Sequence, residues 1–194
     1  MRKKAIILIS MAMITLFGGV TVKENYKYKV IGSVGSIPIY EREVLRECEQ
    51  NRAIVAQNFM EKYHVQMDED FWENQYDGIS PAEELRTSSL QNVIDDKCQQ
   101  LLALEVGIDT CIDYRDFLKI YGKEKNDRKM KVSKGEAVYG PVSFNEADYW
   151  EYYMSNLKIE IINKMVEDGE PDSTEDVNSR YEEAIRQIKQ KYTG

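Results

Sequence analysis

The chain has 194 residues, with 26 Lys and Arg against 34 Asp and Glu, so its net charge is −8 at neutral pH. Nucleic-acid binding requires a basic face and peripheral binding to anionic lipid requires basic clusters, so this acidic balance disfavours both kinds of partner. The length suits a single domain with a substantial core.

The first 22 residues have the pattern of an export signal. Arg2, Lys3 and Lys4 precede an uncharged, mostly apolar run over residues 5–22. A basic start, an apolar core and small residues after it are typical of a secretory signal peptide, and this run also approaches the ~17–20 residues that span a bilayer. We therefore expect residues 1–22 to be a signal peptide or an uncleaved membrane anchor. The remainder would lie outside the cytoplasmic membrane, either secreted or anchored to its outer face.

Removal of residues 1–22 would take away three basic residues and no acidic ones. The 23 remaining Lys and Arg would face 34 Asp and Glu, giving a net charge of −11. A lipoprotein signal is not expected, because the first cysteine is Cys48.

Residues 23–29 are polar and predict a linker, and a small hairpin follows it. Two segments rich in β-forming residues, 28–34 and 37–40, flank Gly35 and Ser36. Pro38 suits only an edge strand or a strand end, which limits the predicted sheet to a minor element.

Helical spacing of apolar residues begins at Glu41 and predicts a helix over 41–63. A short aromatic segment follows over 71–78. Ser80 and Pro81 predict the start of a second helix, which ends at Gly107. Tyr114 begins a third helix, whose tail from Lys123 to Lys134 is strongly charged.

A turn-rich break over 135–142 separates the third helix from the fourth. Ser143 or Asn145 is expected to cap the fourth helix, which extends to about Met165, and a break over 167–172 ends it. The last helix starts at Ser173 or Thr174 and carries an apolar stripe from Val177 to Tyr192. That stripe is expected to pack back on the first helix or to pair with a second copy of the chain. The pattern predicts a mainly α fold with one domain over 30–192.

No catalytic or metal-binding pattern is found in the sequence. The single histidine, His64, lies in a polar connection, and nothing singles out a partner for it in a catalytic triad. The carboxylates over 68–70 have no Gly at the offset that a calcium loop requires, and Asp109 with Asp113 reads as caps or solvated faces. We expect no enzyme active site, no metal and no cofactor.

The three cysteines have no metal-binding spacing. We expect Cys48, Cys98 and Cys111 to be free thiols, the first two of them on apolar helix stripes. A Cys98–Cys111 disulfide is the alternative, because only a short chain reversal separates these two residues.

Two aromatic clusters are the candidate binding residues. An aromatic run on consecutive helix positions covers too wide an arc to be buried wholly in one core, so some rings are expected to face a groove or a partner. The alternative is that the rings pack around a small, irregular core. Adaptable surfaces of aromatics and Met suit the capture of unfolded peptide. The candidate peptide-binding or partner-binding residues are Phe59, Met60, Phe71, Trp72, Tyr76, Tyr149, Trp150, Tyr152, Tyr153 and Met154.

Residues 30–48, VIGSVGSIPIYEREVLREC, resemble the start of the PrsA/SurA-type extracytoplasmic foldases. In that family a strand, a turn and a strand precede a helix that opens with acidic residues. Residues 70–108 look like the next part of the chaperone lobe, and 139–161 and 173–192 resemble helices that lead toward the isomerase domain. The resemblance covers roughly residues 28–192. It implies a helical lobe of the SurA N-terminal kind.

The sequence departs from that family in two ways. The family's enzymes carry a parvulin isomerase domain with active-site histidines and a glycine-rich signature, whereas this sequence has one histidine and neither motif. Many Gram-positive members are lipoproteins, which this sequence does not resemble. The resemblance therefore implies a chaperone lobe without prolyl isomerase activity.

The expected function is chaperone-like binding of unfolded or exported polypeptides in an apolar groove, outside the cytoplasmic membrane. The alternative is an accessory protein for one dedicated partner of an envelope or transport assembly. In either case no nucleic acid is expected as a partner, and membrane contact is expected only through residues 5–22 if they are not cleaved. A homodimer remains an alternative to a monomer.

Overall fold

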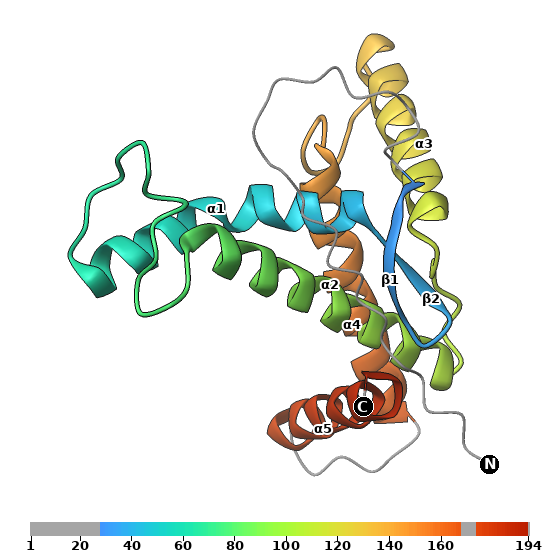
Figure 1. The fold of residues 1–194 in the computed structure, drawn as a ribbon. Coiled ribbons are helices and arrows are strands. Elements are labelled where there is room, and N and C mark those ends of the chain that lie inside the picture. Colours follow the sequence, from blue (N-terminus) through green and yellow to red (C-terminus); the bar gives the residue numbers. More distant parts are fainter. Residues whose placement is uncertain (1–27, 168–173, 194) are drawn as a thin grey trace. The chain divides into compact units, whose positions relative to one another are not determined.

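The computed structural model describes residues 28–167 and 174–193 (Figure 1). The predicted signal peptide or anchor over 1–22, and the predicted linker except for its last two residues, lie outside the described residues. Within these two ranges, no helix is both long and apolar enough to cross a membrane.

The described residues form a two-stranded antiparallel hairpin and five helices, which confirms the predicted mainly α fold with a small N-terminal hairpin. The elements in chain order are β1 (Val30–Val34), β2 (Ile37–Tyr40), α1 (Glu41–Tyr63), α2 (Pro81–Glu105), α3 (Tyr114–Ser133), α4 (Glu146–Glu167) and α5 (Thr174–Thr193). The described chain divides into two compact units. The N-terminal unit comprises residues 28–31 and 39–94, and the C-terminal unit comprises 32–38, 95–167 and 174–193.

The turn between β1 and β2 requires glycine. Gly35 has φ +58, a left-handed conformation that costs an ordinary residue about 1–2 kcal/mol. A Cβ at this position would also lie 2.6 Å from Cδ1 of Tyr192, near the end of α5. The close approach of the Tyr192 ring therefore ties α5 to the hairpin turn within the C-terminal unit.

In the N-terminal unit, hydrogen bonds to a glutamate three positions further along fix the starts of α1 and α2, and those at α2 are reciprocal. The backbone N–H of Tyr40 donates to Oε2 of Glu43 at 2.9 Å, which places a buried carboxylate at the start of α1. Ser80 Oγ accepts from the N–H of Glu83 at 3.2 Å, and the Ser80 N–H donates to Glu83 Oε2 at 3.3 Å. This capping box is the reason why α2 begins where Ser80 and Pro81 predict.

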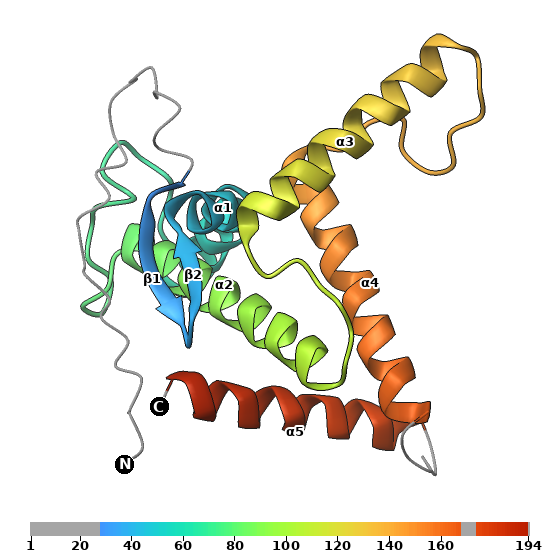
Figure 2. The same cartoon turned by 90° about the vertical axis from the view of Figure 1, so that its right-hand side faces the viewer.

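In the C-terminal unit, α5 contacts α4 and runs past the last turns of α2 (Figure 2). The Tyr181 hydroxyl donates to Gln99 Oε1 at 2.9 Å, and Lys189 Nζ lies 2.6 Å from Asp95 Oδ1. The stripe residues Val177, Tyr181 and Ile188 are buried. The apolar stripe of the last helix is therefore covered within its own unit.

Candidate peptide-binding site

Five rings of the N-terminal unit form one cluster, which we call the N-terminal ring cluster: Phe59, Tyr63, Phe71, Trp72 and Tyr76. The connection between α1 and α2 folds back so that Tyr76 stacks on Tyr63, with ring centroids 5.3 Å apart. Tyr76 also meets Phe59 edge-on at 5.8 Å and Phe71 at 6.1 Å. Ring pairs at these separations stabilise a packed arrangement beyond their burial alone. The cluster therefore anchors the connection to α1.

An open groove of about 390 Å³ lies beside this cluster, along α1 and the first turns of α2. Its apolar floor contains Val55 and Phe59, which are almost fully buried, and Ile54, which is 57% exposed. Its rim carries three asparagines, Asn51, Asn58 and Asn92. All lining residues belong to the N-terminal unit: Asn51, Ile54, Val55, Asn58, Phe59, Lys62, Tyr63, Ile79, Glu84, Ser88 and Asn92.

The rim of the groove is polar and nearly balanced in charge. Each asparagine carboxamide has two donors and an acceptor, which matches the donors and acceptors of a peptide backbone. Lys62 donates to the Tyr63 hydroxyl at 2.8 Å, and this hydrogen bond raises the pKa of Lys62. Lys62 is therefore cationic at neutral pH, and Glu84 supplies an acidic side chain on the same rim.

The rings of the second predicted cluster join a larger group in the C-terminal unit. This C-terminal ring cluster is centred on Phe117, which is fully buried and touches rings on α3 and α4. Its ring centroid lies 4.7 Å from Trp150 and 5.8 Å from Tyr149. The cluster consists of Tyr114, Phe117, Tyr121, Phe144, Tyr149, Trp150, Tyr152 and Tyr153.

Polar bonds fix the outer edges of this cluster. The Trp150 Nε1–H donates to Asp96 Oδ2 at 2.7 Å. The Tyr153 hydroxyl accepts from the Cys111 N–H at 2.8 Å and pairs with Thr110 Oγ1 at 2.7 Å. Because the polar atoms of these rings are used within the unit, most of the C-terminal ring cluster is core rather than ligand surface.

The ten predicted binding residues thus separate into core and surface. Four are buried away from the groove: Phe71, Tyr149, Trp150 and Met154. Phe59 is buried but forms part of the groove floor. Those that remain half-buried or exposed are Met60, Trp72, Tyr76, Tyr152 and Tyr153, of which Tyr152 is the most open at 53%. The Tyr152 ring is thus open to solvent, while its neighbours on α4 are covered by α3 and by the loops that flank it.

Sequence reasoning missed most of the groove. Ile54, Tyr63 and the three asparagines were not among the predicted residues, although α1 carries Asn51, Ile54, Val55, Asn58, Phe59 and Lys62 at steps of three and four. That spacing puts all six on one helix face. This mixture of apolar and amide side chains on one face of α1 is the sequence feature that could have indicated the groove.

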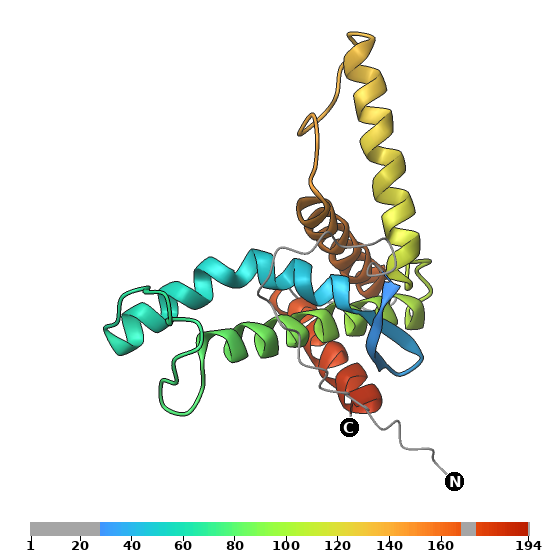
Figure 3. The same cartoon turned by 45° about the horizontal axis from the view of Figure 1, so that its top comes forward.

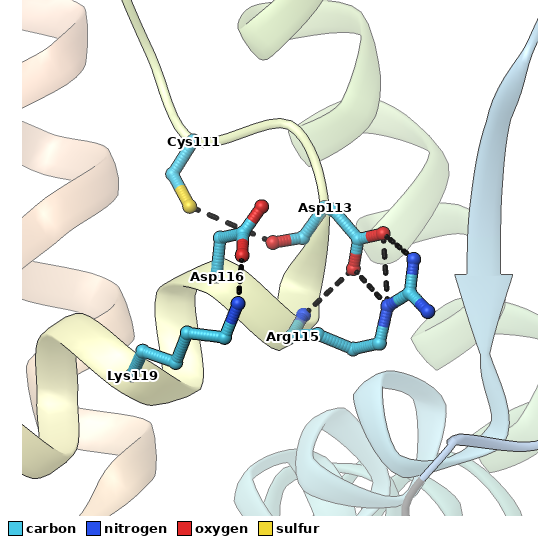
Figure 4. A network of polar contacts seen from close by, with 5 residues as sticks. All are labelled: Cys111, Asp113, Arg115, Asp116 and Lys119. Atoms are coloured by element: carbon cyan, nitrogen blue, oxygen red, sulfur yellow. Dashed lines mark hydrogen bonds and ion pairs between the residues drawn. The ribbon is translucent and has the colours of Figure 1, made fainter.

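A polar network at the start of α3 has a structural role (Figure 4). Asp113 is the N-cap residue and accepts from the Arg115 N–H at 2.8 Å, and its carboxylate also binds the Arg115 guanidinium. Lys119 Nζ lies 2.7 Å from Asp116 Oδ1, and the Cys111 thiol donates to the Asp113 carbonyl at 3.5 Å. Asp113 is thus a helix cap, as predicted. In the described part of the chain, no three His, Cys, Asp or Glu side chains are arranged to hold a metal ion.

The three cysteines are free thiols, with Cys48 and Cys98 buried and Cys111 half-buried. Burial raises the pKa of both Cys98 and Cys111 from 9.0 to about 11. Burial likewise raises the pKa of Tyr149 and Tyr153. These groups therefore keep their protons in the folded chain at pH values where the unfolded chain loses them.

We expect the free energy of unfolding to be constant from neutral pH up to about 9 and to fall as the pH rises from 9 to 11. In this window the unfolded thiols ionise and the folded ones do not, so ionisation favours the unfolded chain. Urea unfolding at pH 8 and pH 10.5 under reducing conditions measures the loss, which should exceed about 1 kcal/mol. A Cys98→Ala variant should show a smaller loss. An increase in the free energy of unfolding between pH 9 and 11 would contradict the raised pKa values of these thiols.

No protein-family model, curated protein or solved structure matches the chain.

Proposed function

We propose that this protein is an extracytoplasmic, chaperone-like module that binds unfolded segments of exported polypeptides, without prolyl isomerase activity. The observation that carries the proposal is the groove of about 390 Å³ beside the N-terminal ring cluster. Its floor offers apolar contact to a side chain, and its asparagine rim offers hydrogen bonds to a backbone. The basic and apolar pattern of residues 1–22 supports a location outside the cytoplasmic membrane.

The composition of the groove fits a low-specificity peptide ligand. Hydrogen bonds to a peptide backbone are available in every sequence, so the asparagines Asn51, Asn58 and Asn92 would bind without selecting a side chain. Ile54 and Phe59 would select for an apolar residue by burying its surface, at about 25 cal/mol per Å² before the cost of ordering the peptide. This combination favours exposed apolar segments of an unfolded chain over folded surfaces.

Purified protein lacking residues 1–22 should suppress the aggregation of a chemically unfolded client at near-stoichiometric concentration, as measured by light scattering. A coupled proline-isomerisation assay should detect no catalysis by the same preparation. If the protein leaves aggregation unchanged and binds no unfolded polypeptide, the proposal is wrong.

The alternative, an accessory protein for one dedicated partner, predicts a different result in a pull-down from envelope extract. A heterogeneous set of captured polypeptides supports the chaperone-like function. Capture of a single stoichiometric partner would contradict the chaperone-like function and support the accessory function.

A further inference from the structure

The charge of the chain is distributed unevenly, and part of the described chain carries a positive excess. Residues 123–142, which comprise the end of α3 and the greater part of the loop before α4, are called here the α3 arm. They carry six Lys and Arg and three Asp and Glu, a net charge of +3 in a chain whose total is −8. Figures 2 and 3 show the end of α3 and its loop extending away from the other helices of the C-terminal unit.

The lysines of the arm are available to a partner. Five are exposed, and none of them takes part in an ion pair among the described residues: Lys123, Lys125, Lys129, Lys131 and Lys134. The remaining cation, Arg128, is held within the arm by Glu124 Oε1 at 2.7 Å. The unpaired positive charge therefore points to a polyanionic partner.

Large apolar side chains are exposed among these lysines. Met130 is 52% exposed and Val132 is 48% exposed, while Tyr139 in the loop is 90% exposed and Val142 is 59% exposed. Met130 and Val132 are two positions apart, which is about 200° around a helix, so they face opposite sides. They therefore do not form the single stripe that a complementary protein groove would bind.

The arm is ordered by its own contacts. The Arg128 guanidinium donates to the carbonyls of Tyr139 at 3.0 Å and Pro141 at 2.6 Å, and it lies 4.8 Å from the Phe144 ring centroid. These bonds hold the loop beside α3 and keep Tyr139 at the surface. The exposed apolar residues are thus presented in advance, without an ordering cost on binding.

We propose that the α3 arm is a contact site for the surface of an anionic phospholipid membrane. The lysine ammonium groups would bind headgroup phosphates, while Met130, Val132 and Tyr139 enter the boundary between headgroups and acyl chains. A fluid interface accepts apolar side chains on several sides of a helix because it needs no matching shape. Lysine stems extend along apolar surface with their charges in water, and tyrosine is enriched at membrane interfaces.

The acidic remainder of the chain does not prevent this contact. Lys134 lies 13 residues beyond Tyr121, whose hydroxyl bonds to the Phe144 carbonyl at 3.1 Å at the edge of the C-terminal ring cluster. At 1.5 Å per residue this separation is about 20 Å, which exceeds the Debye length of about 8 Å in physiological salt. Charges near the cluster are therefore largely screened from the end of the arm.

The test places an environment-sensitive fluorophore on the arm of the full-length chain. Tyr139→Cys is labelled in a Cys111→Ser background, because Cys48 and Cys98 are buried. Emission should rise severalfold with vesicles of phosphatidylglycerol and phosphatidylcholine and should stay unchanged with phosphatidylcholine alone. The same label at Gln190→Cys on α5 should respond to neither. Because the label reports its own surroundings, membrane binding through residues 5–22 does not produce the signal.

Neutralising the arm gives the decisive comparison. Each lysine near an anionic surface contributes roughly a fivefold factor, so three substitutions should weaken insertion by on the order of 100-fold. The arm variant is Lys129→Gln, Lys131→Gln and Lys134→Gln. The matched control removes the same charge from exposed residues outside the arm, as Lys119→Gln, Arg186→Gln and Lys191→Gln, and should insert like the parent. Circular dichroism confirms equal helix content.

Three results would overturn the proposal. Equal emission with both kinds of vesicle would show that anionic lipid is not required. Unchanged insertion of the arm variant would show that the lysines do not contribute. A signal that appears with single-stranded DNA, or with rising protein concentration, but not with vesicles would assign the arm to a nucleic acid or to a second copy of the chain.

Discussion

Replacing Phe117 with Ala should lower the free energy of unfolding by about 3–5 kcal/mol, the largest stability effect we expect from one substitution in this chain. Phe117 is fully buried and its ring contacts five others. Its truncation would leave a cavity between α3 and α4, because rings held by hydrogen bonds, such as Trp150 to Asp96, cannot collapse into the space. Urea denaturation followed by far-ultraviolet circular dichroism measures the loss.

Tyr152→Ala is the control for this prediction. Tyr152 belongs to the same ring cluster but is 53% exposed, so its removal should change stability by only about 0.5 kcal/mol. Phe117→Leu, which refills most of the volume, should cost less than Phe117→Ala. If Phe117→Ala and Tyr152→Ala have equal effects, the C-terminal ring cluster is not the core of its unit.

The positions of the helices follow from local signals in the sequence. Ser80 and Pro81 predict the start of α2, where Ser80 and Glu83 form a capping box, and Asp113 caps α3. These signals involve residues within four positions of one another, so their outcome depends little on the rest of the fold. For the same reason, the hairpin at Gly35 was predictable from a few adjacent residues.

The candidate site was less predictable because burial depends on contacts distant in sequence. Tyr149, Trp150 and Tyr152 are all aromatic residues of α4, yet Trp150 bonds to Asp96, 54 positions away, and of the three only Tyr152 remains open. The groove also depends on the placement of the connection before α2, which brings Ile79 to the face of α1. No periodicity within α1 specifies that neighbour.

The local charge of the α3 arm differs in sign from the charge of the whole chain. A net charge of −8 disfavours anionic partners on average, but residues 123–142 carry +3. Screening over about 8 Å makes the local value the relevant one for a contact at the end of a helix. Whole-chain charge therefore does not decide which partner the α3 arm binds, and the vesicle experiment does.

Replacing Ile54 with Glu should weaken the binding of an apolar, uncharged peptide at least tenfold while leaving the fold intact. Ile54 lies in the groove and is 57% exposed in the free protein, so the substitution should change the free energy of unfolding by no more than about 0.5 kcal/mol. A bound peptide would cover the exposed 57% of the side chain. Because burying a whole Ile contributes about 1.5–3 kcal/mol, covering this part contributes about 0.9–1.7 kcal/mol, where 1.4 kcal/mol is a factor of ten. A carboxylate at that position would also lose its hydration. Fluorescence anisotropy of a labelled peptide measures the change.

Ile159→Glu provides a matched control, because Ile159 on α4 is 56% exposed and lies outside the groove. The two variants have the same charge, the same substitution and nearly the same exposure, so a long-range effect of charge on the peptide would appear in both. A tenfold loss in Ile54→Glu alone assigns binding to the groove. Equal losses in both variants, or none in either, would move the binding surface elsewhere, and the open ring of Tyr152 would then be the next position to substitute.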